Sequence, residues 1–131
     1  VCDMNAEIAK RIANQFSVKS YTSSTKMLKN SDIHAVSLCT WSTSLAKEAL
    51  GALKAGKHVL VEKPMAANAK QAKELLETAE KKGLHLTVGF LMRFIPGLQH
   101  MKRAVQTKAF GAGLFQDHAL KGFLEFDIDF Q

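Results

Sequence analysis

Three short polar segments of the chain carry the side chains best suited to catalysis or to ligand binding. They are Asp3, the run of residues 40–43 and the run of residues 62–64. Each segment follows a short apolar run that reads as a strand. In an open parallel sheet the ligand lies beyond the carboxyl ends of the strands. We therefore expect the three segments to lie along one edge of a sheet.

Lys63 and Asp3 offer the clearest chemistry of these segments. A lysine ammonium beside a carbinol oxygen stabilises the alkoxide that develops as the carbon loses a hydride, and an amine can also carry the hydroxyl proton. A carboxylate at Asp3 suits the ribose hydroxyls of a dinucleotide and repels a 2′-phosphate. From position alone, a solvated lysine at a strand end is the better interpretation of Lys63. A helix cap explains Asp3 equally well.

Apolar runs alternate with helical patterns and predict the elements that position these segments. Asn5 and Asn68 are expected to cap helices, and Gly56 and Gly83 are expected to end them. The apolar run 33–39 predicts a strand buried on both faces. Strands are expected over residues 1–3, 18–21, 33–39, 58–61 and 84–90, and helices over residues 6–16, 23–28, 44–55, 69–82 and 98–105. This order predicts βαβ units in a parallel sheet with helices on both faces.

Composition places the chain among ordinary folded domains. Its 131 residues are 47% hydrophobic and 23% charged, and no segment approaches the roughly 20 apolar residues that cross a bilayer. The net charge is +6, but the lysines are spread over several helices without accompanying aromatics. We therefore expect no nucleic-acid partner, no membrane partner and no metal site. Cys2 and Cys39 are expected to be reduced packing residues of a cytoplasmic protein.

Three runs of the sequence resemble the glucose–fructose oxidoreductase / inositol dehydrogenase / rhizopine catabolism (Gfo/Idh/MocA) family. They are ALKAGKHVLVEKP at 52–64, SDIHAVSLCT at 31–40 and VGFLMRFIP at 88–96. The resemblance covers most of residues 1–105. It implies an α/β fold with a doubly wound, Rossmann-like parallel sheet. Residues 1–108 would form a partial dinucleotide-binding domain, and residues 109–131 a remnant of a second, α+β domain for substrate binding and oligomerisation.

The family's glycine-rich phosphate turn is the element that this sequence does not contain. No G-x-G-x-x-G run occurs anywhere in the chain, and the sequence opens in the middle of the pattern at Val1. We therefore expect a fragment whose first strand and glycine turn precede Val1. In the family's strand order that first strand would lie between the strand ending at Asp3 and the strand ending at Cys39.

The resemblance also assigns roles to individual residues. Lys63 would contact the substrate and the nicotinamide ribose as the catalytic residue. Glu62 would accept hydrogen bonds from ribose, although an ion pair with Lys63 is the alternative. The loop of Thr40, Trp41 and Ser42 would line the cofactor, with Trp41 in place of the usual proline. Leu45 stands where relatives have histidine, which leaves the contacts of this loop open.

Two further residues match the family pattern less closely. Arg93 lies in the Arg-Phe pair that leads toward the substrate site, and a structural ion pair is its alternative. Asp117 is a candidate catalytic residue because it follows a glycine-rich turn. Lys121 stands four residues later where relatives have histidine, so a surface Asp–Lys pair is the alternative.

The resemblance implies an oxidoreductase that transfers a hydride between a nicotinamide cofactor and a carbinol of a sugar, a polyol or a related small molecule. Asp3, followed by Met4 rather than a basic residue, favours NAD over NADP. We expect the intact parent to be a homo-oligomer. The alternatives are a non-catalytic nucleotide-binding sensor or regulator of the same family, or an inactive fragment.

Overall fold

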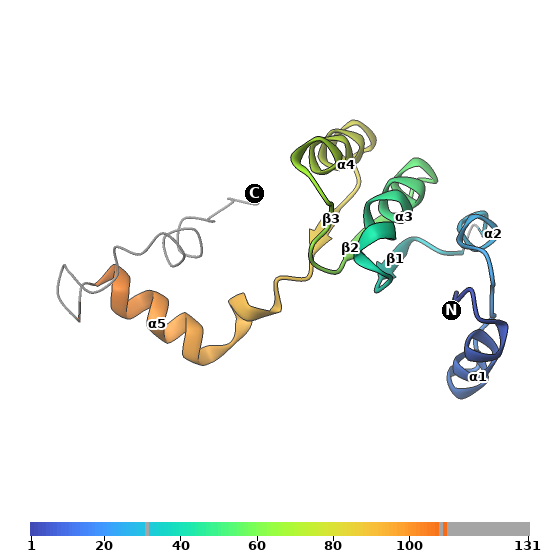
Figure 1. The fold of residues 1–131 in the computed structure, drawn as a ribbon, viewed down its shortest axis with the longest axis horizontal. Helices are drawn as coiled ribbons and strands as arrows, with labels where there is room; N and C mark the ends of the chain where they lie inside the picture. Colours follow the sequence, from blue (N-terminus) through green and yellow to red (C-terminus); the bar gives the residue numbers. More distant parts are fainter. Residues whose placement is uncertain (31, 108, 110–131) are drawn as a thin grey trace. The chain divides into compact units, whose positions relative to one another are not determined.

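A computed structural model describes residues 1–30, 32–107 and 109 of the chain (Figure 1). The chain divides into two compact units, Val1–Gly89 and a second unit that begins at Phe90. The boundary expected near residue 108 falls within the second unit and stays a prediction. Most of the second-domain remnant expected over residues 109–131 lies outside the described residues.

A three-stranded parallel sheet forms the centre of the first unit. Its strands are β1 (Ala35–Leu38), β2 (His58–Val61) and β3 (Leu86–Val88), in the order β1-β2-β3. The last residues of the strands are aligned, because Leu38 pairs with Val61 and Val61 pairs with Val88. The parallel sheet expected from the sequence is thus confirmed. However, β1 and β3 are shorter than the apolar patterns predicted.

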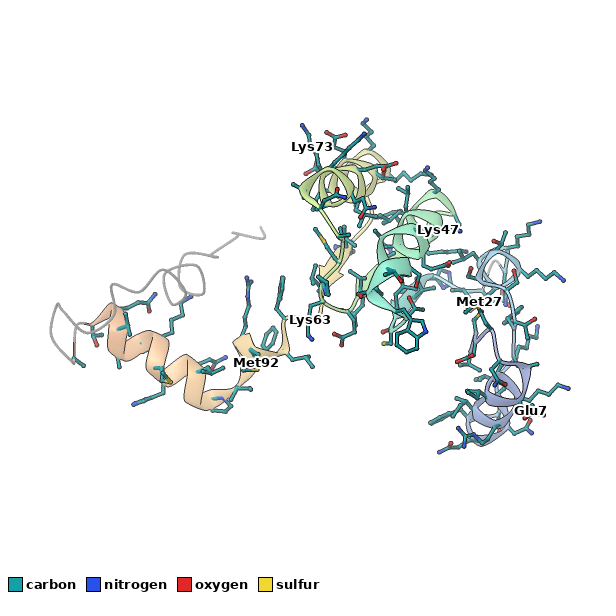
Figure 2. All side chains as sticks on the ribbon, viewed as in Figure 1. Glu7, Met27, Lys47, Lys63, Lys73 and Met92 are labelled. Atoms are coloured by element: carbon teal, nitrogen blue, oxygen red, sulfur yellow. The ribbon has the colours of Figure 1, made fainter. Side chains whose placement is uncertain are left out.

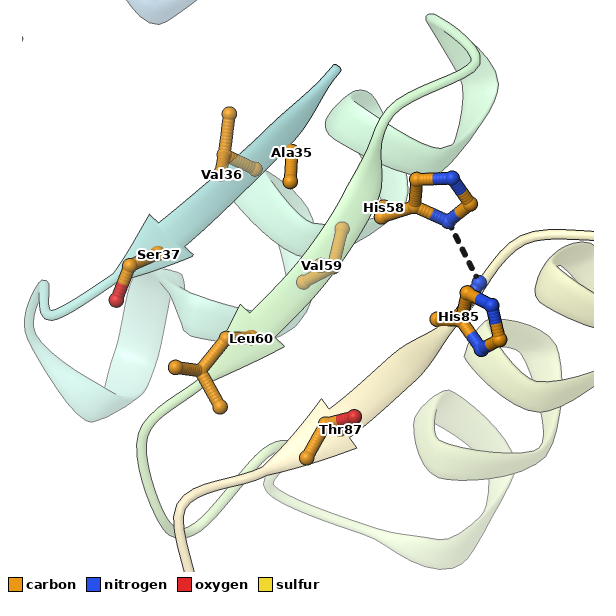
Figure 3. Close-up of a pocket in the computed structure, with 8 residues that line it drawn as sticks. All are labelled: Ala35, Val36, Ser37, His58, Val59, Leu60, His85 and Thr87. Atoms are coloured by element: carbon orange, nitrogen blue, oxygen red, sulfur yellow. Dashed lines mark hydrogen bonds between the residues drawn. The ribbon is translucent and has the colours of Figure 1, made fainter.

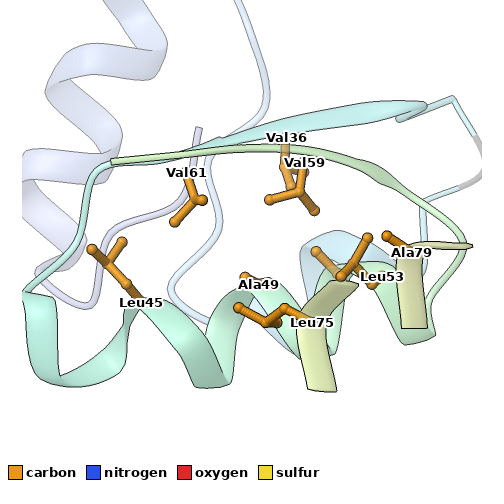
Figure 4. Close-up of a cluster of buried hydrophobic side chains, with 9 residues drawn as sticks. Val36, Leu45, Ala49, Leu53, Val59, Val61, Leu75 and Ala79 are labelled. Carbon is orange, nitrogen blue, oxygen red and sulfur yellow. The ribbon is translucent and has the colours of Figure 1, made fainter. Parts of the chain in front are cut away.

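Two helices cover one face of this sheet and enclose the core with it (Figure 4). They are α3 (Ser42–Lys54) and α4 (Ala69–Lys82), which pack against each other. Asn68 caps α4 by accepting the Gln71 N–H at 3.0 Å, and Gly83 ends it with φ 63°. Burial of the shared apolar face stabilises the unit. The buried core residues are Val36, Leu45, Ala49, Ala52, Leu53, Val59, Val61, Leu75 and Ala79.

The opposite face of the sheet forms a shallow groove (Figure 3). Its outward-facing residues lie in two rows across the strands, Ala35, His58 and His85 followed by Ser37, Leu60 and Thr87. Burial on both faces of the strand at 33–39 was a wrong expectation. Only Val36 in β1 is fully buried, because successive side chains of a strand point to opposite faces and helices α3 and α4 cover just one.

Two histidines join the amino ends of β2 and β3. Nδ1 of His58 accepts the backbone N–H of His85 at 2.9 Å, and the two rings lie 5.0 Å apart between centroids. The carbonyl of His85 in turn accepts the N–H of Val59 at 2.9 Å. The imidazole thus satisfies a backbone donor just before β3 begins.

The first residues of the chain form two helices and one short pairing. Helix α1 (Ala6–Phe16) is capped by Asn5, whose side chain accepts the N–H groups of Glu7 and Ile8. Helix α2 (Ser24–Leu28) is capped by Ser23. The strands expected at residues 1–3 and 18–21 reduce to one parallel bridge between Cys2 and Tyr21. Both cysteines are free, but Cys39 is exposed, so the expectation that it is a packing residue was wrong.

A buried lysine ties α2 to the turn that precedes β2. Lys57 is 9% exposed, and its ammonium donates to the backbone carbonyl of Asn30 at 3.0 Å. Its apolar stem can pack while the charge reaches an acceptor. The contact fixes the end of α2 beside the start of β2.

The second unit contains a 3₁₀ turn, η1 (Leu91–Phe94), and helix α5 (Pro96–Gln106). Pro96 occupies the first turn of α5, where its fixed φ suits a helix start. The helix expected over residues 98–105 is confirmed and begins two residues earlier. Within the described ranges, no helix is long and apolar enough to cross a membrane.

Loss of the Asn68 cap should destabilise the fold. We expect Asn68→Ala to lower the free energy of unfolding by about 1 kcal/mol, because the first turn of α4 loses its side-chain acceptor. Asn68→Asp should stay within about 0.5 kcal/mol of the parent, since aspartate caps equally well. Urea unfolding of the full-length protein measures both. Asn14→Ala, an exposed change inside α1, is the control, and an equal loss there would argue against a capping effect.

The two cysteines should differ in reactivity. Burial raises the pKa of the Cys2 thiol; the positive amino terminus opposes this shift, and the carboxylates of Glu48 and Asp3 add to it, whereas Cys39 is exposed. Because the thiolate is the nucleophile, Cys2 should react more slowly than Cys39 with iodoacetamide at pH 8. Time-resolved peptide mass spectrometry would measure the two rates. Faster modification of Cys2 would contradict the burial described here.

Candidate active site

Two backbone hydrogen bonds continue the sheet for one residue beyond its strands. The N–H of Glu62 donates to the Leu38 carbonyl at 3.0 Å, and the N–H of Gly89 donates to the Val61 carbonyl at 2.9 Å. Glu62 follows β2 and Gly89 follows β3 at aligned positions. The two residues therefore lie side by side at the carboxyl edge of the sheet.

The Glu62 carboxylate lies against Gly89. A Cβ atom added to Gly89 would stand 3.4 Å from Oε1 and 3.6 Å from Oε2 of Glu62. Oε2 also accepts the backbone N–H of Lys63 at 3.2 Å. The carboxylate is thus held over the edge of the sheet with acceptor capacity to spare, since an ionised carboxylate has about four lone-pair sites.

Lys63 presents an exposed ammonium at the same edge (Figure 2). No ion pair joins it to Glu62 in the part of the chain that the structure describes, where the one salt bridge links Lys73 and Glu77. The structure therefore does not show the ion pair with Lys63 that was the alternative interpretation of Glu62. The Lys63–Pro64 peptide bond, which follows, is cis.

The loop after β1 turns directly into helix α3. Trp41 occupies the N-cap position without a side-chain capping bond in the described chain, and its indole is 80% exposed. Thr40 Oγ1 lies 2.9 Å from Ser44 Oγ, which donates to the Trp41 carbonyl at 2.9 Å. Ser42 is the first residue of α3. The first N–H groups of a helix have no partner within it and carry a partial positive charge.

Leu45 lies in the core rather than at the site. It is 1% exposed and belongs to the cluster between α3 and the sheet. A leucine at this position therefore contributes packing and cannot exchange a proton. Figure 4 shows it beneath Val61, the last residue of β2.

Asp3 does not follow a strand of the three-stranded sheet in the described structure. It follows the Cys2–Tyr21 bridge, which is isolated from β1, β2 and β3. Its Oδ1 accepts the N–H of Asn5 at 2.8 Å, immediately before α1. Asp3 is thus not the helix cap that the sequence left open, because Asn5 caps α1; its bond to the Asn5 N–H uses one of the two carboxylate oxygens.

The remaining two predicted residues do not belong to the first unit. Arg93 belongs to the second unit, where its guanidinium lies 4.9 Å from the centre of the Phe90 ring. Asp117 lies outside the described residues. Gly89, in contrast, was missed by reasoning from the sequence, because its contribution is the absence of a side chain. The available signal was its place inside the strand expected over residues 84–90, where glycine is uncommon.

The donor set at this edge suits a polyhydroxylated organic ligand. It combines a carboxylate acceptor, an ammonium, hydroxyl groups and the start of a helix, on Glu62, Lys63, Thr40 and Ser42. The space beside Gly89 leaves room at the carboxylate. These polar groups and this space fit a ribose-bearing cofactor. Over residues 1–30, 32–107 and 109, no three histidine, cysteine, aspartate or glutamate side chains could hold a metal ion.

Comparison with known proteins agrees with this fold. Among curated relatives, the inositol 2-dehydrogenase/D-chiro-inositol 3-dehydrogenase of Shouchella clausii is 31% identical over 87% of this chain and 34% of its own length. The WlbA dehydrogenase of Bordetella pertussis, solved with NADH and UDP-GlcNAcA, is 29% identical with a TM-score of 0.77. The alignment covers 84% of this chain and 32% of WlbA.

A second solved structure is KijD10, a 3-ketoreductase from Actinomadura kijaniata with TDP-benzene and NADP. It is 27% identical with a TM-score of 0.78, over 84% of this chain and 35% of its own. The chain thus spans about a third of the length of each of these relatives. Residues 1–90 match the oxidoreductase family with an NAD-binding Rossmann fold. The chain belongs to the Gfo/Idh/MocA oxidoreductase family.

Proposed function

We propose that the full-length protein is an NAD-dependent oxidoreductase acting on a carbinol of a sugar, a polyol or a related small molecule. The observation that carries the proposal is the placement of Glu62 and Lys63 together at the carboxyl edge of the parallel sheet. Open parallel sheets bind their ligands beyond this edge. Relatives that are named inositol dehydrogenases support the substrate class.

Glu62 and the loop of Thr40, Trp41 and Ser42 are the groups that would hold the cofactor. When bound, a nicotinamide cofactor supplies the carrier for the two electrons of the reaction. The Glu62 carboxylate would accept hydrogen bonds from ribose hydroxyls with the lone pairs that the Lys63 N–H leaves open. The exposed Trp41 indole offers a flat apolar surface next to the start of α3.

Lys63 would act on the substrate oxygen. Oxidation of a carbinol requires its hydroxyl proton to leave as the carbon is oxidised, and a nearby cation stabilises the oxygen anion that develops. The ammonium of Lys63 has no ion-pair partner among the described residues, so its charge is available to a ligand. Arg93 and Asp117 are proposed to complete the cofactor and substrate contacts from the remainder of the chain.

Asp3 should make the full-length protein prefer NAD to NADP. One oxygen of this carboxylate is used by the Asn5 N–H, and the other remains for a ribose hydroxyl. A 2′-phosphate would meet a like charge there, and Met4 offers no cation to offset it. Because like charges in contact cost several kcal/mol, we expect kcat/KM for NAD to exceed that for NADP by about 10-fold or more.

Steady-state kinetics with both cofactors would measure this preference, and Asp3→Asn should reduce it. A matched control is Asp32→Asn, another exposed aspartate of the first unit. Higher kcat/KM with NADP in the parent would show that the Asp3 carboxylate does not face the adenosine ribose.

Replacement of Lys63 should remove turnover while leaving cofactor binding nearly intact. We expect Lys63→Ala to lower kcat by about 100- to 1,000-fold, the typical cost of losing one preorganised group that stabilises an oxyanion. Lys63→Arg should rescue only in part, because arginine keeps its charge but cannot release a proton near neutral pH. Turnover and NADH affinity of the full-length protein are the measurements.

The control for Lys63→Ala is Lys70→Ala, which removes another exposed lysine at the start of α4. Its turnover should match that of the parent. If Lys63→Ala lowered turnover by only about 3-fold or less, the loss would be far smaller than removal of an oxyanion-stabilising group causes. Lys63 would then be a solvated residue at a strand end.

A further inference from the structure

The outer face of the sheet is the face opposite α3 and α4. Next to Glu62 on this face, Gly89 leaves one position without a side chain. Along this face His58 lies beside His85, the residue before β3, and Leu60 of β2 lies beside Thr87 of β3. Because side chains alternate along a strand, the next pair on the same face is Glu62 and Gly89. The hydrogen bond from the Gly89 N–H to the Val61 carbonyl keeps this third pair in register.

The backbone at position 89 does not require glycine. Gly56 and Gly83 have φ values of 76° and 63°, which side chains rarely adopt, and Gly89 is not among these left-handed positions. An L-residue is therefore compatible with its backbone. What a side chain would meet is the carboxyl group of Glu62, with Oε1 at 3.4 Å, the carboxyl carbon at 3.5 Å and Oε2 at 3.6 Å from the added Cβ.

We propose that Gly89 is a positioning residue for the Glu62 carboxylate, which it leaves uncovered so that both oxygens can accept hydrogen bonds from a ribose diol. The inference rests on the proposed function of Glu62. At the distances given, a single methyl group makes ordinary van der Waals contact with all three carboxyl atoms. It fits without a clash, but it covers one face of the carboxylate.

Side chains larger than alanine at position 89 should displace the Glu62 carboxylate and not only cover it. The γ-carbons of valine extend beyond Cβ, where the carboxyl atoms already lie at contact distance, so the carboxylate must move. Movement breaks the hydrogen bond that Oε2 accepts from the Lys63 N–H. Position 89 therefore acts on the ligand only through Glu62, and its effect should grow from alanine to valine.

The Lys63 amide reports the position of the carboxylate without any cofactor. In full-length protein labelled with ¹⁵N-lysine, we expect the Lys63 amide resonance to shift in Gly89→Val in the same direction as in Glu62→Ala. Gly51→Ala should leave it unchanged, because a Cβ there meets nothing within 4 Å. A Lys63 amide that shifts in Glu62→Ala but not in Gly89→Val would overturn the inference.

NADH affinity, measured by calorimetry on the same proteins, tests the functional consequence. Loss of a hydrogen bond to a charged group should weaken binding about 10-fold or more in Glu62→Ala and in Gly89→Val, and about 3-fold in Gly89→Ala. In the Glu62→Ala background, Gly89→Val should add no further loss, whereas independent sites would give additive losses. Thermal unfolding confirms that each variant is folded.

The outcomes separate the two proposals. Suppose that NADH affinity is unchanged in Glu62→Ala but the Lys63 amide shifts in Gly89→Val. Glu62 would then have no role in cofactor binding, although a side chain at position 89 would still displace its carboxylate. Additive losses in the double variant would show that Gly89 acts independently of Glu62 and would overturn the positioning role. Non-additive losses with the amide shift support both.

Discussion

The aligned ends of β1, β2 and β3 determine which residues of this chain can act on one ligand. Leu38, Val61 and Val88 lie in register, so the residue after each strand emerges at the same edge. Backbone hydrogen bonds then carry the alignment one residue further, to Glu62 and Gly89. Strand pairing thus brings together side chains that are far apart in the sequence. A one-residue slip of β2 would turn Glu62 to the other face.

The register is itself maintained by the core on the opposite face. Val59 and Val61 of β2 are buried against Leu45 and Leu53 of α3 and against α4. Apolar residues thus occupy the positions between the outward-facing ones. Leu45 links the buried core to the exposed edge. Its side chain packs beneath Val61, the last residue of β2, and the loop just before it carries Thr40, Trp41 and Ser42 of the candidate site. The exposed polar edge depends on this buried layer.

Most of the fold followed from the sequence, and so did the position of Glu62 and Lys63 directly after a strand. Capping residues and helix-ending glycines located α1, α3 and α4 well, because these signals are local. Strand lengths and burial were predicted less accurately, since β3 pairs over three residues and only one face of β1 is covered. Whether a neighbouring element covers a strand is not a property of its own residues. Gly89 was missed for the same reason, because its contact with Glu62 joins two strands.

The exposed indole of Trp41 gives the molecule a built-in optical probe. The sequence contains one tryptophan, and that residue stands at the N-cap of α3 with 80% of its surface exposed. Tryptophan emission from these 131 residues therefore originates at the candidate site and comes from an exposed ring. A ligand that covers the ring would change both the emission wavelength and the intensity of the tryptophan fluorescence. Occupancy of this edge can thus be followed in solution without attaching a dye.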